Sequence, residues 1–354
     1  MRGSAVDEGW MGVFRSPIVT YQRYRDHIED AVVAAALALL VGIFLNATGV
    51  YAEQWRMVLL LGIFAVGTQV RAWGYYAALA VLLWPIWQLS PYLGALFLAI
   101  TLLPRTWIVE TLPWILLVAS APLLAQWQII GLLPLLAGVM AGPGRAMAFG
   151  VLAALWLKIV GGLSGWLPEI GALHGAPFSV ELVRDTVTGA DSLEILLLLL
   201  RPFSQSSFLL LLHVLQIVAW GVAGWLTGQI YQMEWKEREP RYLLVPTLAT
   251  GALVLWAAIY LVPAWLDLQP LMTFMSTATP TVGLALSALT TALGTMLYEG
   301  LQRPVPRRAP RPQTTTKMGR EGPETVAEES TPRRRPWTDA GQSEEDDVIM
   351  LELD

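Results

Sequence analysis

The chain has 354 residues, of which 55% are hydrophobic and only 14% are charged, and its formal net charge is −5. Soluble domains carry about a quarter charged residues, so this composition predicts a protein built for lipid. The chain contains no cysteine, which excludes disulfides, iron–sulfur clusters, zinc–thiolate sites and thiol nucleophiles.

Apolar runs and the residues that interrupt them predict an all-α integral membrane protein. We expect a polytopic helical bundle of about ten transmembrane helices, with about eight as the lower number. In chain order, the runs cover residues 31–50, 57–70, 72–88, 92–103, 108–126, 128–142, 146–166, 206–231, 242–265 and 273–298. At about 1.5 Å per residue, the runs 57–70, 92–103 and 128–142 are shorter than the roughly 30 Å hydrocarbon core. These three segments are expected to be thin, tilted or re-entrant.

The same pattern divides the chain into five parts. We expect a cytoplasmic N-terminal segment (1–29), transmembrane helices one to seven (30–166), an external segment (167–205), transmembrane helices eight to ten (206–300) and a disordered cytoplasmic tail (301–354). The tail is rich in Pro, Arg, Thr and Glu. It has too few apolar residues to offset the entropy lost on ordering.

The position of Arg145 decides how two of these runs are connected. In a single helix over 131–158, Arg145 would lie near the centre of the bilayer, at a cost of about 3 kcal/mol or more. Gly142, Pro143 and Gly144 directly precede it and form a strong turn signal. The sequence therefore predicts a hairpin tip at Arg145.

Lysine and arginine fall on alternate loops of the ten-helix arrangement. If the N-terminus is cytoplasmic, that side holds all 23 of these residues except Arg56, Lys158, Arg184 and Arg201. Arg71, Arg105 and Arg145 are then topology anchors at cytoplasmic hairpin tips. This bias predicts a multi-pass protein of the plasma (inner) membrane with both termini in the cytoplasm.

The external segment contains one apolar run, 193–200, that is too short to cross a membrane. Asp191 or Ser192 is expected to cap it, with Glu194 in the first turn, while Arg201 and Pro202 are expected to end it. We predict an amphipathic or half-inserted helix here. It is either a lid packed over the bundle or a gate for a ligand.

Three polar side chains within predicted transmembrane helices are candidates for an intramembrane site. Lys158 lies near the external end of its helix, so its long stem also fits a structural role with the amine at the membrane surface. His213 and Gln216 are three residues apart and share a helix face. They are expected either to make ordinary interhelical hydrogen bonds or to line a path for protons or a solute.

The last predicted transmembrane helix carries a seam of small residues at spacings of three or four. Its members are Ser276, Pro280, Gly283, Ser287, Thr291 and Gly294. Such a seam lets another backbone approach closely, so helix packing is the favoured interpretation. A kink at Pro280 is expected as well, and kinked helices are also where transporters build sites.

The tail contains candidate sites for modification and docking. Thr331, Thr338 and Ser343 are candidate phosphoacceptors, although serine and threonine are common in any disordered tail. The last nine residues, DDVIMLELD, combine acids with large apolar groups, a pattern typical of segments that fold onto a partner. The tail therefore predicts an interaction with a cytoplasmic signalling protein.

No acidic pair, His–Glu cluster, phosphate-cradling glycine loop or nucleophile elbow is present in the sequence. We therefore assign no catalytic, cofactor-binding or metal-ligating residues. Neither an enzyme activity nor a nucleic-acid partner is expected.

Two stretches, LLPLLAGVMAGPGRAMAFGVLAALWLKIVGGLSG and LLHVLQIVAWGVAGWLTG, resemble the polytopic membrane portion attached to some bacterial eukaryotic-like serine/threonine kinases. This chain has no kinase domain, since it lacks the glycine-rich loop and the His-Arg-Asp and Asp-Phe-Gly motifs. The resemblance implies a membrane partner in kinase signalling. The Gly-Pro-Gly-Arg hairpin is also similar to substrate-binding membrane subunits of vitamin importers.

Two hypotheses about function follow. The first is a non-enzymatic membrane anchor or regulatory component whose tail docks partners or is phosphorylated by them. The second is a small-solute transporter, either a permease or a substrate-binding membrane subunit, in which Lys158, His213 and Gln216 line a cavity near the midplane.

Overall fold

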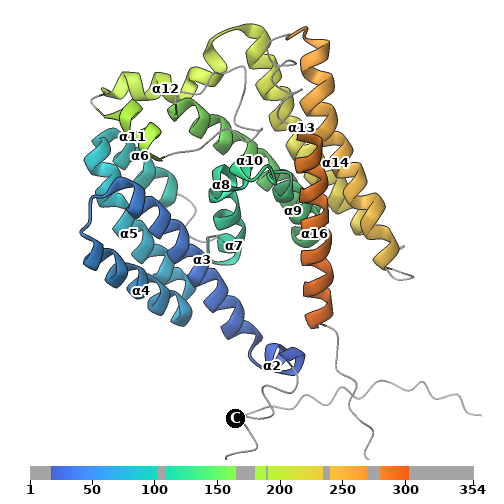
Figure 1. The fold of residues 1–354 in the computed structure, drawn as a ribbon, viewed down its shortest axis with the longest axis horizontal. Coiled ribbons are helices and arrows are strands. Elements are labelled where there is room, and N and C mark those ends of the chain that lie inside the picture. The colour runs from blue at the N-terminus through green and yellow to red at the C-terminus, as the bar shows by residue number, and fades with distance from the viewer. Residues whose placement is uncertain are drawn as a thin grey trace, which may run out of the picture. The chain divides into compact units, whose positions relative to one another are not determined.

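The structure is a computed structural model that describes residues 17–102, 108–164, 180–188, 190–233, 240–268 and 280–302, all of whose regular elements are helical (Figure 1). In chain order, the helices are α2 (Pro17–Arg23), α3 (Arg25–Thr48), α4 (Glu53–Gln69), α5 (Arg71–Leu89), α6 (Pro91–Leu102), α7 (Ile108–Ala119), α8 (Ala121–Gln126), α9 (Leu132–Ala141), α10 (Pro143–Leu163), α11 (Val180–Val187), α12 (Ser192–Ser204), α13 (Ser207–Tyr231), α14 (Pro240–Trp265) and α16 (Pro280–Gln302). The chain divides into two units, residues 1–305 and 306–354. All described residues belong to the first unit.

Five of the described helices are long and apolar enough to cross a membrane, namely α3, α10, α13, α14 and α16. The predicted class of helical membrane protein is supported by these five. Their lengths do not establish the expected number of about ten spans, because several other predicted spans are short helices. Among these, α6 and α7 have 12 residues each and α9 has 10, or about 15 to 18 Å.

The predicted single run over 108–126 is wrong, since the chain breaks at Ser120 between α7 and α8. The Ser120 hydroxyl donates a 2.7 Å hydrogen bond to the carbonyl oxygen of Leu117, one turn back. The next run begins at Leu132 rather than at residue 128, where Gln128 has a positive φ of 59°. A residue in this left-handed region cannot continue a right-handed helix, so the two runs shorten around a compact turn.

The first helices form what we call the N-terminal group, consisting of α3, α4, α5 and α6. Its hydrophobic cluster contains Leu37, Val41, Leu45, Ile63, Tyr75 and Ala78, together with Leu112 and Leu116 of α7. Helices α4 and α5 approach closely at Gly67 and Gly74, where a Cβ on Gly74 would lie 2.5 Å from the Cα of Gly67. Glycine at both positions permits this approach.

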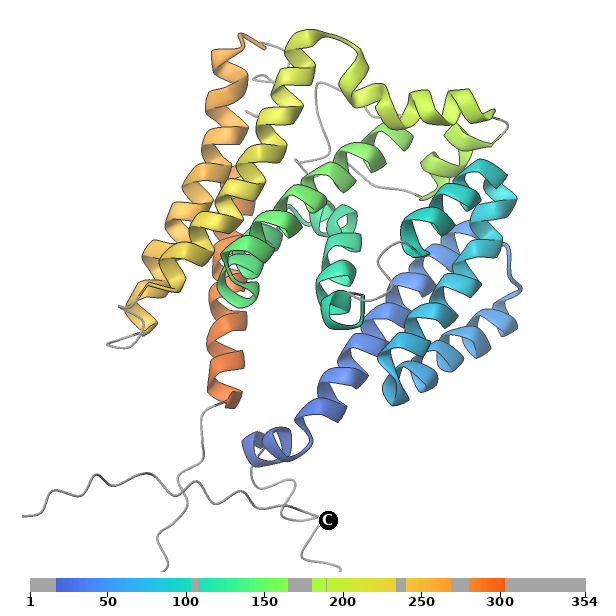
Figure 2. The same ribbon diagram turned by 180° about the vertical axis from the view of Figure 1, so that it is seen from behind.

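The later helices form the C-terminal group, consisting of α9, α10, α13, α14 and α16 (Figure 2). Its hydrophobic cluster includes Leu135, Leu157, Trp220, Leu255 and Leu284, one from each helix. Helix α9 contacts all four of the others and is buried among them. A helix too short to span a bilayer is tolerated at membrane depth when protein surrounds it.

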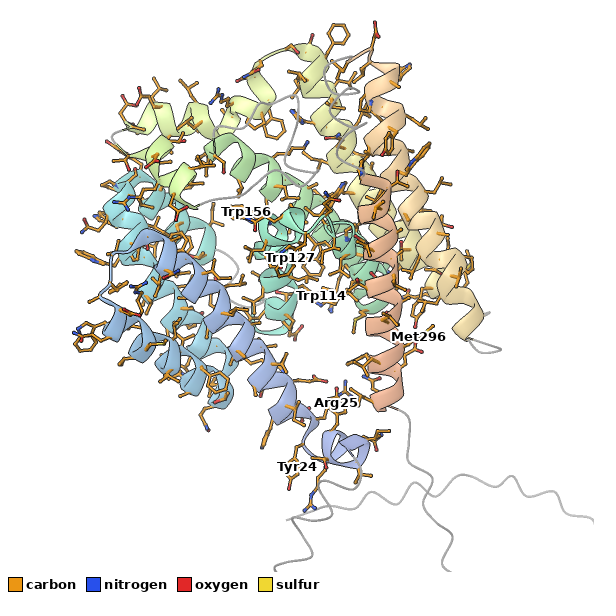
Figure 3. All side chains as sticks on the ribbon, viewed as in Figure 1. Tyr24, Arg25, Trp114, Trp127, Trp156 and Met296 are labelled. Atoms are coloured by element: carbon orange, nitrogen blue, oxygen red, sulfur yellow. The ribbon has the colours of Figure 1, made fainter. Side chains whose placement is uncertain are left out.

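Helix α7 contacts both groups, since it packs against α3 and against α10. On the α10 side, Trp114 stacks on Phe149 with 5.5 Å between ring centroids. Figure 3 shows Trp114 among the side chains of α7. This aromatic pair, together with Leu112 and Leu116, makes α7 a link between the two groups.

The turn expected before Arg145 is present. Gly142 has a φ of 82° and separates α9 from α10, which begins at Pro143. Glycine adopts this backbone conformation without strain, and proline suits the first turn of a helix. The Arg145 side chain is exposed in that turn. The side of the membrane on which it lies stays a prediction.

The helix expected at 193–200 is α12. Asp191 caps it in a capping box, in which the Asp191 carboxylate accepts from the Glu194 amide at 2.8 Å and Glu194 accepts from the Asp191 amide at 3.1 Å. The expected end at Arg201 and Pro202 is wrong, because α12 continues to Ser204. Proline lacks the amide that would donate to the carbonyl four residues earlier. That carbonyl, on Leu198, lies instead against the bare Cα of Gly162 in α10.

Candidate functional site

Helices α10 and α13 run antiparallel and side by side, and their closest contacts are at glycines (Figures 1 and 2). A Cβ on Gly150 would lie 2.5 Å from the carbonyl oxygen of Trp220, and one on Gly224 would lie 2.7 Å from the carbonyl oxygen of Ala146. Any larger residue at these positions would collide with backbone atoms that cannot easily move. The glycines therefore fix the register between α10 and α13.

This register brings Lys158 of α10 to Gln216 of α13. Lys158 is 1% exposed and Gln216 is 2% exposed. The Lys158 Nζ donates a 2.6 Å hydrogen bond to the Gln216 Oε1. The alternative role for Lys158, with its amine at the membrane surface, does not fit this burial, because the amine lies in the interface between α10 and α13.

The two faces of α10 differ sharply at this level. Trp156, which is labelled in Figure 3, precedes Lys158 by two residues and therefore lies about 200° away around the helix. Its side chain is 37% exposed. Lys158 thus occupies the inner face of a helix whose outer face carries a large aromatic residue.

His213 lies one helical turn before Gln216 on the same face of α13 and is completely buried. Its ring meets the Phe203 ring edge to face, with 5.8 Å between centroids and an interplanar angle of 76°. Phe203 belongs to α12, so α12 contacts the end of the polar cluster. The structure therefore joins Lys158 and Gln216 by a hydrogen bond at the α10–α13 interface and places His213 one turn away on α13, against α12.

Helix α12 packs over this end of the α10–α13 pair. A Cβ on Gly162 would lie 2.6 Å from the carbonyl oxygen of Leu198 and 2.9 Å from the Pro202 ring. Ile195 is also buried here, at 3% exposure, against Leu163 and Val187. These contacts fit the predicted lid packed over the bundle.

The hydrogen-bonding groups of Lys158 and Gln216 are mostly donors. An ammonium has three N–H groups and no acceptor, and a glutamine amide adds two N–H groups to one oxygen. The Gln216 oxygen accepts a hydrogen bond from Lys158, so the Gln216 NH₂ group is the remaining donor of that amide. Within the described residues, no carboxylate forms an ion pair with Lys158.

The small residues of α16 serve packing in the described part of the seam. Ser287 and Thr291 are completely buried, and their hydroxyls donate 2.8 Å hydrogen bonds to carbonyl oxygens four residues earlier in the same helix. Gly294 is exposed, and Thr295 takes its place on the buried face. Ser276 lies outside the described residues. Because α16 begins at Pro280, the kink expected there falls at the edge of the described helix.

A second polar cluster, which was not among the sequence-based candidates, joins α2 and the start of α3 to the end of α16. Tyr21 donates to Glu29 at 2.9 Å, and Arg25 donates to Glu29 at 2.9 Å and to the Tyr298 hydroxyl at 3.1 Å. The Gln22 amide donates to the carbonyl oxygen of Leu301 at 3.1 Å. Figure 3 shows Arg25 at the start of α3 near the lower end of α16. Only the Arg25–Glu29 spacing of four residues signalled any part of this cluster.

The topology anchors have different surroundings. Arg71 forms an ion pair with Asp30 that joins the start of α5 to α3. Arg145 is exposed at the start of α10. Arg105 and the tail candidates Thr331, Thr338 and Ser343 lie outside the described residues, and their roles stay predictions.

Comparisons of the chain with protein-family models, with curated proteins and with solved structures find no match. The expected resemblance to kinase-linked membrane portions and to vitamin importers therefore stays a prediction. The arguments below rest on the geometry of the described helices alone.

Proposed function

We propose that the protein is a polytopic membrane protein that binds a small solute at an intramembrane site formed by Lys158, Gln216 and His213. This is the transporter hypothesis, as a permease or as the substrate-binding membrane subunit of a larger system. The observation that carries it is the complete burial of Lys158 between two helices that are long and apolar enough to span a membrane.

A lysine at this position is costly without a function. A charged side chain inside a membrane costs on the order of 3 kcal/mol on insertion scales, and such residues face the protein interior where they line pathways or bind ligands. A methionine or leucine would fill the same space without that cost. The single hydrogen bond to Gln216 replaces only part of the water that an amine loses on burial.

The glycine contacts support a fixed binding geometry. Because Gly150 and Gly224 hold the two backbones in register, the Lys158 amine and the Gln216 amide are positioned before any ligand arrives. Helix α12 covers one end of the cluster through Phe203, packs against both α10 and α13, and is joined to α13 by the short link at Gln205 and Ser206. Because α12 covers this end of the cluster, it has to move if a solute enters from that side.

The proposal is tested by ligand capture with the full-length protein in detergent. The wild type, Lys158→Met and Gln216→Leu are each equilibrated with a small-molecule extract of the cells that produce the protein, repurified and analysed by mass spectrometry. The wild type is expected to retain a compound that both variants lose, and proteoliposomes should then take up that compound.

Gln229→Leu is the matched control, because Gln229 lies on the same helix with an exposed side chain. This variant should retain the compound as the wild type does. Equal retention by all four proteins, or no retained compound in any of them, would refute the proposed site.

For the topology, we propose that both termini lie in the cytoplasm and that the protein resides in the plasma membrane. The exposed Arg145 in a helix–helix turn and the basic residues on alternate loops support this orientation. Reporter fusions after residue 71 and after residue 145 should both be intracellular. A fusion on the opposite face at either position would reverse the proposed map.

The anchor or signalling hypothesis stays a prediction, because the residues that motivate it lie outside the described part of the chain. Its test is a pull-down with full-length protein and with a variant that lacks residues 303–354. Deletion should abolish recovery of a partner, and a tail of the same composition in scrambled order serves as the control. Unchanged recovery after deletion would contradict it.

A further inference from the structure

We propose that the intramembrane site binds the oxyanion group of its ligand, a carboxylate or a phosphate, through Lys158 and Gln216. This inference rests on the proposed solute-binding function and specifies the chemical class of the solute. It comes from the balance of charge and of hydrogen-bond donors around the Lys158 amine.

The first argument is charge. Lys158 is the only side chain of the cluster that carries a full charge in its ordinary ionised form, and its described hydrogen-bond partner is a neutral amide. The ion pairs in the described residues, Arg25–Glu29 and Arg71–Asp30, belong to other helices. An ammonium in a low-dielectric core is stabilised most by an anion in direct contact. A ligand oxyanion supplies the countercharge that the described helices do not.

The second argument is the count of donors. One Lys158 N–H is used by the Gln216 oxygen, which leaves two N–H groups on the amine and two on the Gln216 amide nitrogen without acceptors among the described residues. These four N–H donors match a ligand group that only accepts hydrogen bonds. Carboxylate and phosphate oxygens have this property, whereas a sugar hydroxyl or an amine would bring further hydrogen-bond donors to the site.

The third argument is selectivity against cations. Groups of three or more acidic, histidine or cysteine side chains that could hold a metal ion are absent from the described residues. A cation beside Lys158 would meet a like charge in a dry environment, which disfavours it strongly. A neutral polar solute would leave the ammonium without a countercharge. The oxyanion is the class that satisfies both the charge and the donors.

The experiment measures the thermal unfolding of the full-length protein in detergent with named probes. Acetate, benzoate and inorganic phosphate are added at fixed ionic strength set with chloride, and acetamide and benzamide serve as neutral counterparts of matched size. At least one oxyanion at roughly ten times its Kd is expected to raise the unfolding midpoint by about 3 °C. The shift should be absent in Lys158→Met and retained in Lys158→Arg.

A second measurement reports on Lys158 directly. The chain has three lysines, Lys158, Lys236 and Lys317, so labelling with an amine reagent that enters the membrane gives two internal controls. An oxyanion that binds should slow the labelling of Lys158 at least fivefold and leave the other two rates unchanged.

The outcomes separate the class of solute from the existence of the site. If acetamide or benzamide protects Lys158 as well as acetate or benzoate does, the oxyanion inference fails and solute binding at Lys158 stands. If ligand capture also finds no Lys158-dependent compound, both the oxyanion inference and the proposed solute-binding function fail. If none of the oxyanions shifts the midpoint or slows the labelling, the oxyanion inference is overturned.

Discussion

The N-terminal and C-terminal groups are both packed helices with apolar cores, yet they place their polar residues differently. In the N-terminal group, the described ion pairs lie at or near the starts of α3 and α5, where Arg25 and Glu29 are 46% and 33% exposed. In the C-terminal group, Lys158, His213 and Gln216 are buried within α10 and α13. The first pattern stabilises helix ends, and the second is the proposed binding site.

The difference follows from how closely the backbones approach. Within the described part of the C-terminal group, glycines bring α10 to α13 at Gly150 and Gly224, and bring α14 to α13 where Gly251 meets the Thr227 hydroxyl. In the N-terminal group, α4 meets α5 at Gly67 and Gly74 and α6 meets Trp87 of α5 at Gly94, whereas Gly62 has open space where its Cβ would be. A rigid, close-packed interface can hold a costly buried charge in one geometry, whereas a looser one would let it reach water.

The sharpest test of this comparison is the loss of the only described partner of Lys158. Gln216→Leu leaves the amine buried without its acceptor, so the free energy of unfolding should fall by about 3 kcal/mol. In a Lys158→Met background, the same change should cost less than about 1 kcal/mol. Unfolding in mixed micelles measures both, and equal losses in the two backgrounds would show that the two side chains are not coupled.

The glycine contacts give the next largest effect. Gly150→Ala places a methyl group 2.5 Å from the Trp220 carbonyl oxygen and should destabilise the protein by about 2 kcal/mol. Gly62→Ala, in the open position on α4, should instead stabilise it by up to about 1 kcal/mol, since alanine is the better helix former. Thermal unfolding of the two variants measures both changes in stability. The same sign for both would remove the distinction between the two groups.

Removal of a single charge should act in opposite directions in the two groups. Lys158→Met combined with Gln216→Leu replaces the buried polar pair by apolar side chains and should stabilise the fold by about 1 kcal/mol while it abolishes ligand capture. Arg25→Met removes an exposed ion pair and should destabilise the fold by about 0.5 kcal/mol. Chemical unfolding with parallel ligand capture measures the two effects. A marked destabilisation by the double replacement would indicate that the Lys158–Gln216 pair serves structure rather than binding.

Local rules account for much of the described fold. The turn at Gly142, the cap at Asp191 and the bounds of α13 follow from residue types near the break. Periodicity placed His213 and Gln216 on one helix face, but no local rule pairs Lys158 with Gln216, because that contact depends on the register of α10 against α13. The cluster around Arg25 and Tyr298 joins residues 273 positions apart, so only the folded chain reveals it.

The smallest expected effect concerns Tyr21, which lies in α2, outside the helices that are long enough to span. Partial burial, and then the hydrogen bond to Glu29, raise the pKa of Tyr21 above its ordinary value of 10.0. Because the folded-state pKa is the higher one, this contribution to stability is fully present below pH 10 and is lost as the pH rises through the folded pKa.

The free energy of unfolding of the wild type should therefore fall more steeply above pH 10 than that of Tyr21→Phe. The difference should stay under about 0.5 kcal/mol, since water screens a half-exposed pair. Tyr24→Phe, at a side chain that is 44% exposed, is the control and should follow the wild type. If Tyr21→Phe also follows the wild type through this range, the contact between α2 and Glu29 adds nothing to stability. The polar residues at the start of α3 would then serve only the contact between α3 and α16.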